Sequence, residues 1–457
     1  MMTLNDTAPP IPFGTPSELL DDGISLLRDL IRIDTTNPPG NEVLAAEYAE
    51  RRLAEVGIAV EHFEPAPGRR SILARLGPGT RDGLALSAHL DVVPADASKW
   101  RHPPFAAVED EGCIWGRGTI DMKHMAAYGL AVLRHLARTR ARLARPLSLL
   151  LVADEEAGCA LGSLAVARER PEWLAASAAL TEVGGFTTWV DGHRVYPVQV
   201  AEKGFVWLRL TIHGQPGHGS MPREDSALIE LARLVQVFAA QPFPFRATAP
   251  AIGFIQGIAD VLGFPKASIF RAIGSPLLSD FVLDKLVRDP DRTRVFRALL
   301  RDTIAPTMVQ AGDKANVIPG TASLTIDCRI LPGTDIDRFI NELRQRVPGR
   351  YDLEILASGP AVVMQQDHPI LAQIRTVVEE ADPSAVVVPS MLTGFTDARA
   401  FSEVGVPCYG FAPIWLPPTL NFAAMFHGHD ERIPIFGFRW GLATLYELTR
   451  RVLQVRA

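Results

Sequence analysis

The sequence predicts an α/β protein with a layered sheet, into which a smaller α+β module is inserted. Before residue 200 and again after residue 360, apolar strand-like runs alternate with amphipathic helical stretches. Pro146–Ala153 is a continuous apolar run, which is typical of a strand buried on both faces. Phe205–His213 and Thr321–Ile330 instead alternate apolar with polar residues, as half-covered antiparallel strands do.

This change of pattern divides the chain into three segments. Residues 1–200 are predicted to form the first part of the larger domain, and residues 360–457 its second part. Residues 201–359 are predicted to form the inserted module, in which strand, helix, strand, helix and strand follow one another. Within it, residues 242–312 are rich in Phe, Ile, Leu and Pro, and we expect a helical elaboration there. A chain of 457 residues is long enough for two or three domains.

The individual elements can be placed along the chain. A capping box at Thr15-Pro16-Ser17-Glu18, with proline at the first helical position, is expected to open a helix that runs to about Ile33. The helix ends before the breaker Asn37–Gly40. The other expected helices are Asn41–Val56, Met122–Arg138, Ser226–Ala239, Asp335–Val347, His368–Ala381 and one after Phe436. The other expected strands are Ala59–Phe63, Ser71–Leu76, Leu84–Ala88, Ala178–Leu180, Tyr351–Ala357 and Ala385–Pro389.

The composition argues against several classes of protein. Hydrophobic residues make up 47% and charged residues 21%, which is ordinary for a globular protein. The net charge is −6, and no basic stripe interleaved with aromatics predicts a nucleic-acid partner. No apolar run reaches the roughly 20 residues that cross a bilayer, and the N-terminus lacks a secretory pattern. We therefore expect a cytoplasmic enzyme without a membrane partner, with its four cysteines as reduced core thiols.

Side chains suited to metal binding follow three predicted strands. His89 and Asp91 come directly after the strand at 84–88, Asp154–Glu156 follows the buried apolar run, and Glu182 follows the strand at 178–180. Loops at the carboxyl ends of strands carry the ligands of open α/β sheets. Imidazole suits zinc, and an aspartate two residues away can orient it.

Two further candidates complete this set. Asp121 stands just before a predicted helix, and His427 lies in the C-terminal segment FHGHDE. Two histidines and three carboxylates can serve two ions that share one carboxylate, while the remaining glutamate of the pair Glu155-Glu156 accepts a proton from water. A lone His-x-Asp is more often a surface pair, and paired glutamates usually open a helix. The prediction of a metal site therefore rests on the whole set of residues in this order along the chain.

The order of these segments resembles the di-zinc aminoacylase and carboxypeptidase superfamily, including acetylornithine deacetylase, succinyl-diaminopimelate desuccinylase and carboxypeptidase S. The matching segments are Ile31–Gly40, Ser87–Pro94 (SAHLDVVP), Trp115–Lys123 (WGRGTIDMK) and Asp154–Gly158 (DEEAG), and the resemblance covers nearly the whole chain. It implies a zinc-peptidase-like catalytic domain with a mixed sheet flanked by helices. It also implies that the inserted module is a ferredoxin-like lid and dimerisation domain.

The resemblance also implies the roles of the metal-site residues. Asp121 would bridge two divalent ions, expected to be zinc with cobalt or manganese as alternatives. Glu155 would be the general base and later the acid, and Asp91 would brace His89. His429 falls on a variable position of the family pattern and is expected to be a neighbour only. The implied ligands are His89, Asp121 and Glu182 for one ion and Asp121, Glu156 and His427 for the other.

The inserted module carries further residues that resemble the family's lid. His218 matches the histidine that reaches into the partner subunit's site and polarises the scissile carbonyl. Asn316 and Arg329 match residues that hold the substrate, with Arg329 as a carboxylate clamp. Gly394 lies in a loop that borders the substrate pocket. The resemblance thus implies a homodimer formed through the lid.

Departures from the family pattern bear on the substrate. His124 stands where relatives often carry glycine, Val183 stands where better-known deacylases place proline, and the 242–312 insertion is longer and more apolar than in compact members. These features favour a carboxypeptidase S-like hydrolase. We expect it to cleave the amide bond of an N-acyl amino acid or small peptide that bears a free carboxylate and a hydrophobic group.

Two alternatives remain open at this point. The first is a dipeptidase or an acetylornithine-type deacetylase that acts on small polar substrates. The second, from a different class, is a catalytically inactive metal-binding interaction protein. The presence of Glu155 beside a full ligand set argues against the second alternative.

Overall fold

The computed structural model describes residues 9–240, 243–287, 289–347, 349–420 and 422–456. The chain divides into two compact units. Unit 1 consists of residues 1–200, 364–390 and 396–457, and unit 2 consists of residues 201–363 and 391–395. Among the described residues, no helix is both long and apolar enough to traverse a bilayer.

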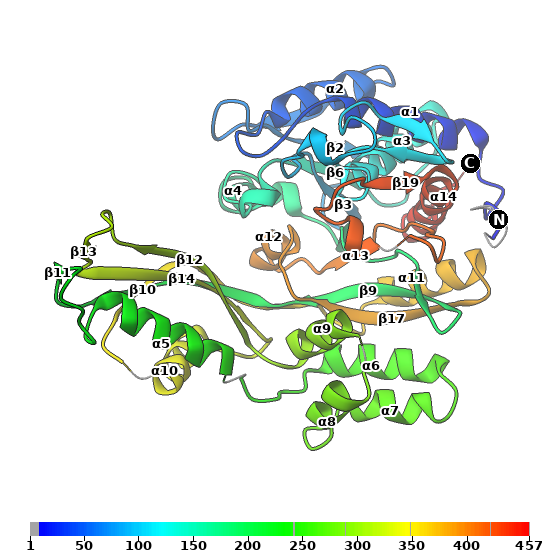
Figure 1. Cartoon of the computed structure of the whole chain (residues 1–457). Coiled ribbons are helices and arrows are strands. Elements are labelled where there is room, and N and C mark those ends of the chain that lie inside the picture. Colours follow the sequence, from blue (N-terminus) through cyan, green and yellow to red (C-terminus); the bar gives the residue numbers. More distant parts are fainter. Residues whose placement is uncertain (1–8, 241–242, 288, 348, 421, 457) are drawn as a thin grey trace. The chain divides into compact units, whose positions relative to one another are not determined.

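Unit 1 is built on a mixed sheet with the strand order β1-β2-β6-β3-β7-β18-β9 (Figure 1). The pairs β6–β3, β3–β7 and β7–β18 are parallel, and the strands towards both edges pair antiparallel. Every residue of β3 and β6 is buried, as expected for central strands covered on both faces. The strands are β1 (Val60–Phe63), β2 (Ser71–Leu76), β3 (Leu84–His89), β6 (Leu147–Val152), β7 (Ala178–Thr181), β9 (His193–Glu202) and β18 (Cys408–Gly410), with β8 (Thr188–Val190) and β17 (Ala385–Leu392) paired to β9.

Helices flank this sheet, which confirms the predicted α/β class. Helix α3 packs against α1, α2, β3 and β6, and Figure 1 shows α1, α2 and α3 grouped beside β2 and β6. Helix α14 packs against α1, α3 and α11, while α4 packs against α12. The helices of unit 1 are α1 (Ser17–Arg32), α2 (Glu42–Ala54), α3 (Lys123–Arg138), α4 (Ser163–Glu169), α11 (Pro369–Ala381), α12 (Ala398–Glu403), α13 (Phe422–Met425) and α14 (Ile435–Val452).

The predicted capping box before α1 is wrong. The helix begins at Ser17, and the residue before it, Pro16, has extended backbone angles of φ −58° and ψ 131°. No side chain caps the first turn of α1. The Thr15 hydroxyl instead donates a hydrogen bond to the carbonyl oxygen of Pro12.

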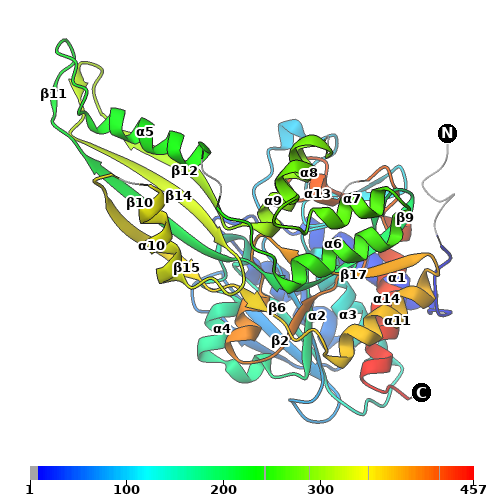
Figure 2. The same ribbon diagram turned by 90° about the horizontal axis from the view of Figure 1, so that it is seen from below.

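Unit 2 contains an antiparallel sheet with the order β12-β14-β10-β15, as seen from below in Figure 2. With helices α5 and α10, this is the strand order of a β-α-β-β-α-β unit. Alternate residues of β10 and β14 lie in one apolar core with residues of α5 and α10. The elements are β10 (Gly204–His213), α5 (Ala227–Ala240), β12 (Thr303–Ala311), β14 (Thr321–Ile330), α10 (Ile336–Arg346) and β15 (Asp352–Gly359), with the short strands β11 (Gly217–His218), β13 (Val317–Ile318) and β16 (Val362–Val363).

The insertion is helical over most of its length, but its last part is not. Residues 303–311, which fell within the expected helical elaboration, form the edge strand β12. The preceding helices have their own apolar core, which includes Ile255, Leu283 and Leu300. We call these four the insertion helices: α6 (Ala249–Val261), α7 (Lys266–Ala272), α8 (Ser279–Lys285) and α9 (Pro290–Leu300).

Candidate metal centre

Three parallel strands of unit 1 end at the same edge of the sheet and deliver three groups of polar residues. His89 is the last residue of β3 and pairs with Val152, the last residue of β6. A short 3-10 turn, Glu155–Ala157, follows β6, and Glu182 follows β7, which pairs with β3. Because parallel strands share one carboxyl edge, the sequence order of these motifs becomes a spatial cluster.

A second, smaller sheet brings the distant C-terminal segment to the same place. Strand β19 (Arg432–Pro434) pairs antiparallel with β5 (Cys113–Trp115), which in turn pairs with β4 (Val108–Asp110). The pairing sets Arg432 opposite Trp115, and the carbonyl oxygen of Glu431 accepts a hydrogen bond from the N–H of Gly116. His427 is therefore held beside the loop that carries Asp121, which lies more than 300 residues earlier in the chain.

Asp121 lies between two imidazoles. One of its oxygens, Oδ1, is 3.1 Å from Nε2 of His89, and the other, Oδ2, is 3.0 Å from Nε2 of His427. His427 Nε2 is also 3.1 Å from Glu156, and His89 Nε2 is 3.6 Å from Glu182. All five predicted ligands thus converge, with Asp121 at the centre.

Asp91 organises the groups around this cluster. Its carboxylate accepts hydrogen bonds from the backbone N–H groups of Glu155 and Glu156, each at 3.1 Å. It also accepts one from the side-chain amide of Asn37 at 2.8 Å. Nδ1 of His89 lies 3.0 Å from the main-chain carbonyl oxygen of Asp91 and 3.5 Å from its carboxylate. Asp91 is completely buried, so it fixes the ring of His89 and the turn of the two glutamates together.

The cluster fits a bound cation. The ligand atoms of His89, Asp121 and Glu156 lie within 4.8 Å of one another, and so do those of His89, Glu155 and Glu182. One buried carboxylate oxygen, Glu156 Oε1, has no hydrogen-bond partner in the described part of the chain, and the imidazole of His427, at 3.0 Å, is the partner of Asp121 Oδ2. Buried carboxylates without hydrogen bonds are costly unless a cation compensates them. Imidazole and carboxylate are the donors that zinc accepts.

The pKa values of the ionisable groups in the cluster also indicate that a cation would stabilise it. Burial, together with the charge of Glu182, raises the pKa of Glu155 well above its ordinary value. Burial and the charge of Asp121 raise the pKa of Glu156 to about 7, and burial raises that of Glu182 to about 8. Hydrogen bonds to Asp121 and Glu156 raise the pKa of His427 to about 10. A cation among these carboxylates would offset the repulsion that raises their pKa values.

Unit 2 brings two of its predicted residues together. Strand β11 pairs with β13, so that His218 lies opposite Val317, and the carbonyl oxygen of Asn316 accepts a hydrogen bond from the N–H of Gly219. Both His218 and Asn316 are exposed. Nδ1 of His218 accepts a hydrogen bond from the N–H of Ser220 at 3.2 Å, and the Ser220 hydroxyl lies 2.7 Å away. This arrangement places the ring hydrogen of a neutral His218 on Nε2.

Arg329 lies on β14, on the sheet face opposite the apolar core of unit 2. Its guanidinium donates two parallel hydrogen bonds to Asp327, at 2.8 and 3.0 Å. It also lies over the rings of Phe205 and Phe395, at 6.0 and 5.5 Å from their centres. Nη1 of Arg329 is buried and has no hydrogen-bond partner among the described residues. Gly394 adjoins Phe395 and therefore borders the same cluster.

The two remaining histidines near the motifs differ in their surroundings. His124 is buried and packs edge to face against Tyr128, and burial lowers its pKa to about 3. His429 is exposed. Neither has an identified contact with the carboxylates of the cluster, whereas His427, which like them is outside the two groups of possible ligands among the described residues, lies 3.0 Å from Asp121 and 3.1 Å from Glu156.

Sequence reasoning assigned no role to three buried residues that support the cluster. The carboxylate of Glu431 accepts hydrogen bonds from the N–H groups of Gly118, Ile120 and Asp121 and forms an ion pair with Arg117. Asn37 bonds to Asp91, as described above. The third is Asp397, whose charge adds to burial in raising the pKa of Glu155. Asn37 lies in the matching segment Ile31–Gly40, Glu431 lies in the segment FHGHDE with His427, and Asp397 lies three residues after Gly394, so closeness to these segments was the available signal.

Known proteins are similar to this chain over most of its length. Over 420 residues, the chain is 28% identical to aminoacylase-1 of Pongo abelii, covering 90% of each chain. It is 28% identical over 375 residues to the human N-fatty-acyl-amino acid synthase/hydrolase PM20D1, covering 79% of this chain and 72% of that protein.

Among solved structures, the fold matches the M20 family metallo-carboxypeptidase Sso-CP2 from Sulfolobus solfataricus with a TM-score of 0.71 at 16% identity. The match covers 94% of this chain and 99% of that one. Residues 85–451 match Peptidase family M20/M25/M40. That match spans both units and every residue of the metal cluster, and the chain belongs to this family of hydrolases.

Proposed function

We propose that the protein is a hydrolase dependent on two metal ions, which cleaves the amide bond of an N-acyl amino acid or small peptide with a free carboxylate. The observation that carries this proposal is the position of Asp121 between His89 and His427, with Glu155 beside the cluster. Membership of a peptidase family and the similarity to aminoacylase-1 support the reaction class.

Each ligand has a proposed place. Asp121 would be shared between the two ions, which we expect to be zinc. Bound metal ions would supply a water molecule of lowered pKa. The ligand sets are His89, Asp121 and Glu182 for one ion and Asp121, Glu156 and His427 for the other.

Glu155 is the proposed general base. It would accept the proton of the attacking water and then deliver it to the leaving nitrogen. Its backbone N–H is fixed by Asp91, so its position does not depend on a long flexible connection. Burial and neighbouring carboxylates raise its pKa, which suits a group that must hold a proton between the two steps.

His218 is proposed to act on the substrate carbonyl. Because Nδ1 accepts from Ser220, Nε2 carries the hydrogen and can donate to the oxygen that becomes negative in the transition state. The ring is exposed on unit 2, which leaves it accessible to a substrate or to a second copy of the chain. We propose that it acts across a homodimer formed through unit 2.

Arg329 and Asn316 are proposed to hold the substrate. Arg329 is already aligned by Asp327, and its buried Nη1 lacks a partner among the described residues, so a substrate carboxylate would satisfy it. The Phe205 and Phe395 rings beside it offer apolar contact. Gly394, next to Phe395, would leave room for the substrate backbone.

A hydrophobic acyl group is the proposed specificity. The similarity to a protein named as an N-fatty-acyl-amino acid synthase/hydrolase supports this choice, and so does the apolar character of the insertion. We further propose a cytoplasmic location, in keeping with four cysteines that are buried thiols.

A substrate panel tests the proposal. The enzyme would be loaded with zinc or cobalt and incubated with N-dodecanoyl, N-acetyl and dipeptide substrates, with release of the free amine measured. Matched amides in which the terminal carboxylate is blocked serve as controls. We expect cleavage of N-dodecanoyl amino acids and little cleavage of the blocked forms. Preference for dipeptides would favour the dipeptidase alternative. If no amide with a free carboxylate is cleaved, the proposed activity is wrong, and the alternative of a catalytically inactive metal-binding protein is favoured.

A further inference from the structure

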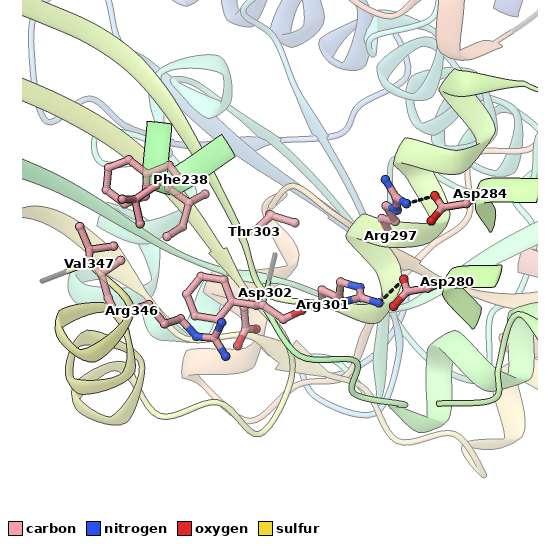
Figure 3. Close-up of a pocket in the computed structure, with 13 residues that line it drawn as sticks. Phe238, Asp280, Asp284, Arg297, Arg301, Asp302, Thr303, Arg346 and Val347 are labelled. Carbon is pink, nitrogen blue, oxygen red and sulfur yellow. Dashed lines mark hydrogen bonds and ion pairs between the residues drawn. The ribbon is translucent and has the colours of Figure 1, made fainter. Parts of the chain in front are cut away.

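Unit 2 contains a cavity that takes no part in the proposed reaction. It has a volume of about 520 Å³ and lies between the sheet with α5 and α10 on one side and the insertion helices α8 and α9 on the other (Figure 3). None of its lining residues belongs to the metal cluster or to the predicted substrate-binding set. Its volume is within the range of about 300–1,000 Å³ that small-molecule sites occupy.

One side of the cavity is apolar. Phe238 from the end of α5, Phe243 and Ile304 line it, together with Leu343 and Val347 at the end of α10. Phe243, Leu343 and Val347 are part of the apolar core of unit 2, and the other two pack against that core. This wall is therefore rigid and offers an aliphatic chain a continuous apolar surface.

The other side carries guanidinium groups whose acidic neighbours are already engaged. Arg301 donates to Asp280 at 2.5 Å and to the carbonyl oxygen of Phe243 at 2.8 Å, and Arg297 pairs with Asp284. Figure 3 shows these two ion pairs on the opposite side of the view from Phe238 and Val347. The third acid, Asp302, accepts the N–H of Leu331 at 2.6 Å.

The balance of donors and acceptors selects the charge of a ligand. A guanidinium has five N–H donors. Arg297 uses one of them on Asp284, and Arg301 uses one on Asp280 and one on the carbonyl oxygen of Phe243. The three carboxylates each already accept at least one hydrogen bond. Arg346 lies on the apolar side, 4.9 Å from the centre of the Phe243 ring, and its Nε donates a hydrogen bond to Glu342 at 2.8 Å, so that its Nη groups are the ones that would meet a ligand.

From this lining we infer that the cavity is a non-catalytic binding site for a hydrophobic carboxylate, such as a medium- or long-chain fatty acid. The aliphatic chain would lie along Phe238, Phe243 and Leu343, and the carboxylate would meet the guanidinium group of Arg346, with those of Arg297 and Arg301 across the cavity. The bound molecule would connect the insertion helices to the sheet of unit 2. The inference concerns binding alone and holds whatever substrate the metal centre takes.

Isothermal titration of the metal-loaded full-length protein tests the inference. Dodecanoate should bind with one molecule per chain at this site. Affinity should rise roughly threefold to fourfold for each methylene from octanoate to dodecanoate, as expected for burial of an aliphatic chain. Dodecanol should bind more weakly than dodecanoate. Dodecyltrimethylammonium binding as tightly as dodecanoate would overturn the inference, because the acidic residues would then select the ligand.

Two arginine variants on helix α10 locate the site. Arg346→Met should weaken dodecanoate binding at least tenfold, as expected for loss of a charge-assisted hydrogen bond. Arg344→Met is the matched control, because Arg344 is exposed on the same helix and does not line the cavity, and it should bind normally. Should Arg346→Met fold poorly, Arg346→Lys keeps the charge and should retain partial binding. Binding that is lost in Arg329→Met and unchanged in Arg346→Met would place the fatty acid elsewhere and refute the cavity site.

Discussion

The two units hold their functional side chains in opposite ways. In unit 1, the cluster around Asp121 is assembled from segments that are up to about 300 residues apart, and each side chain is fixed by another buried group. In unit 2, His218 and Arg329 are held by Ser220 and Asp327, each only two residues away. Long-range contacts therefore hold the side chains of unit 1, whereas those of unit 2 are oriented by residues close to them in the sequence.

A similar buried lysine in each unit allows the stability of the two units to be measured separately. Among the described residues, each unit contains a buried lysine that donates to carbonyl oxygens at the end of a helix. Lys123 donates to Leu30 and Ile33 at the end of α1, and Lys203 donates to Ala298 and Arg301 at the end of α9. Burial lowers the pKa of each to about 7. The two lysines are therefore separate probes of the two units.

The largest expected effect comes from the base in unit 1. Glu155→Gln should lower kcat by about 10²–10⁴, because the amide cannot accept the proton of water. Zinc content, measured by mass spectrometry of the native protein, should stay near two ions per chain. Glu156→Gln is the contrasting neighbour and should lose metal. Equal turnover in Glu155→Gln and in the wild type would contradict the role of Glu155 as the general base.

The next effect tests whether unit 2 completes a site on another subunit. His218→Ala should lower kcat by about 10²–10³, as for loss of one oxyanion donor, with metal content unchanged. His213→Ala, in the same segment, is the control, since His213 pairs with Asp352 at 2.9 Å. A mixed dimer of Glu155→Gln and His218→Ala chains should regain activity, because one of its two sites would combine intact copies of both residues. If the mixture stays inactive, His218 acts within its own chain or not at all.

Much of the metal centre follows from the sequence, because its residues sit at strand ends. A buried run such as Leu147–Val152 predicts a central strand, and parallel neighbours bring their carboxyl ends together without further information. The role of Glu431 does not follow in this way. It depends on the pairing of β19 with β5, and nothing in either three-residue strand encodes its partner.

Local patterns mislead where tertiary contacts decide. Strand β12 was missed because seven of its nine residues are exposed, so its side chains show no alternation. Its hydrogen bonds to β14 define it, and Pro306 sits at a register shift, where an edge strand tolerates proline. Similarly, Thr15-Pro16-Ser17-Glu18 has the letters of a capping box, but the extended backbone of Pro16 turns the Thr15 hydroxyl to Pro12.

A smaller effect on metal affinity tests the preorganisation of unit 1. Glu431→Gln keeps the size of the side chain but removes the charge that pairs with Arg117 and holds the loop before Asp121. Metal affinity should fall by about 10–100-fold, as for loss of an outer hydrogen-bond partner. Competition with a coloured chelator would measure this. Asp430→Asn is the adjacent control and should bind metal normally, and an equal loss in both variants would indicate general damage to the segment.

The smallest expected effect is on stability, and it comes from the two lysines, which compare the units directly. The folded-state pKa of Lys203 is lowered from 10.5 to about 7, so between these values the unfolded chain binds a proton that the folded chain does not. The free energy of unfolding of unit 2 should therefore rise with pH in this window, by at most about 1.4 kcal/mol per pH unit.

Two variants test this pH dependence. Lys203→Met should remove the pH dependence of the unfolding free energy in α9, and Lys123→Met should remove it in α1. Each variant also leaves two carbonyl oxygens without their donor at every pH, which destabilises the protein equally across the window. Hydrogen exchange of peptides from α9 and α1 in urea at pH 7.5 and 9.5 would separate the two. A wild-type slope in α9 that survives in Lys203→Met would mean that this lysine is charged in the folded protein.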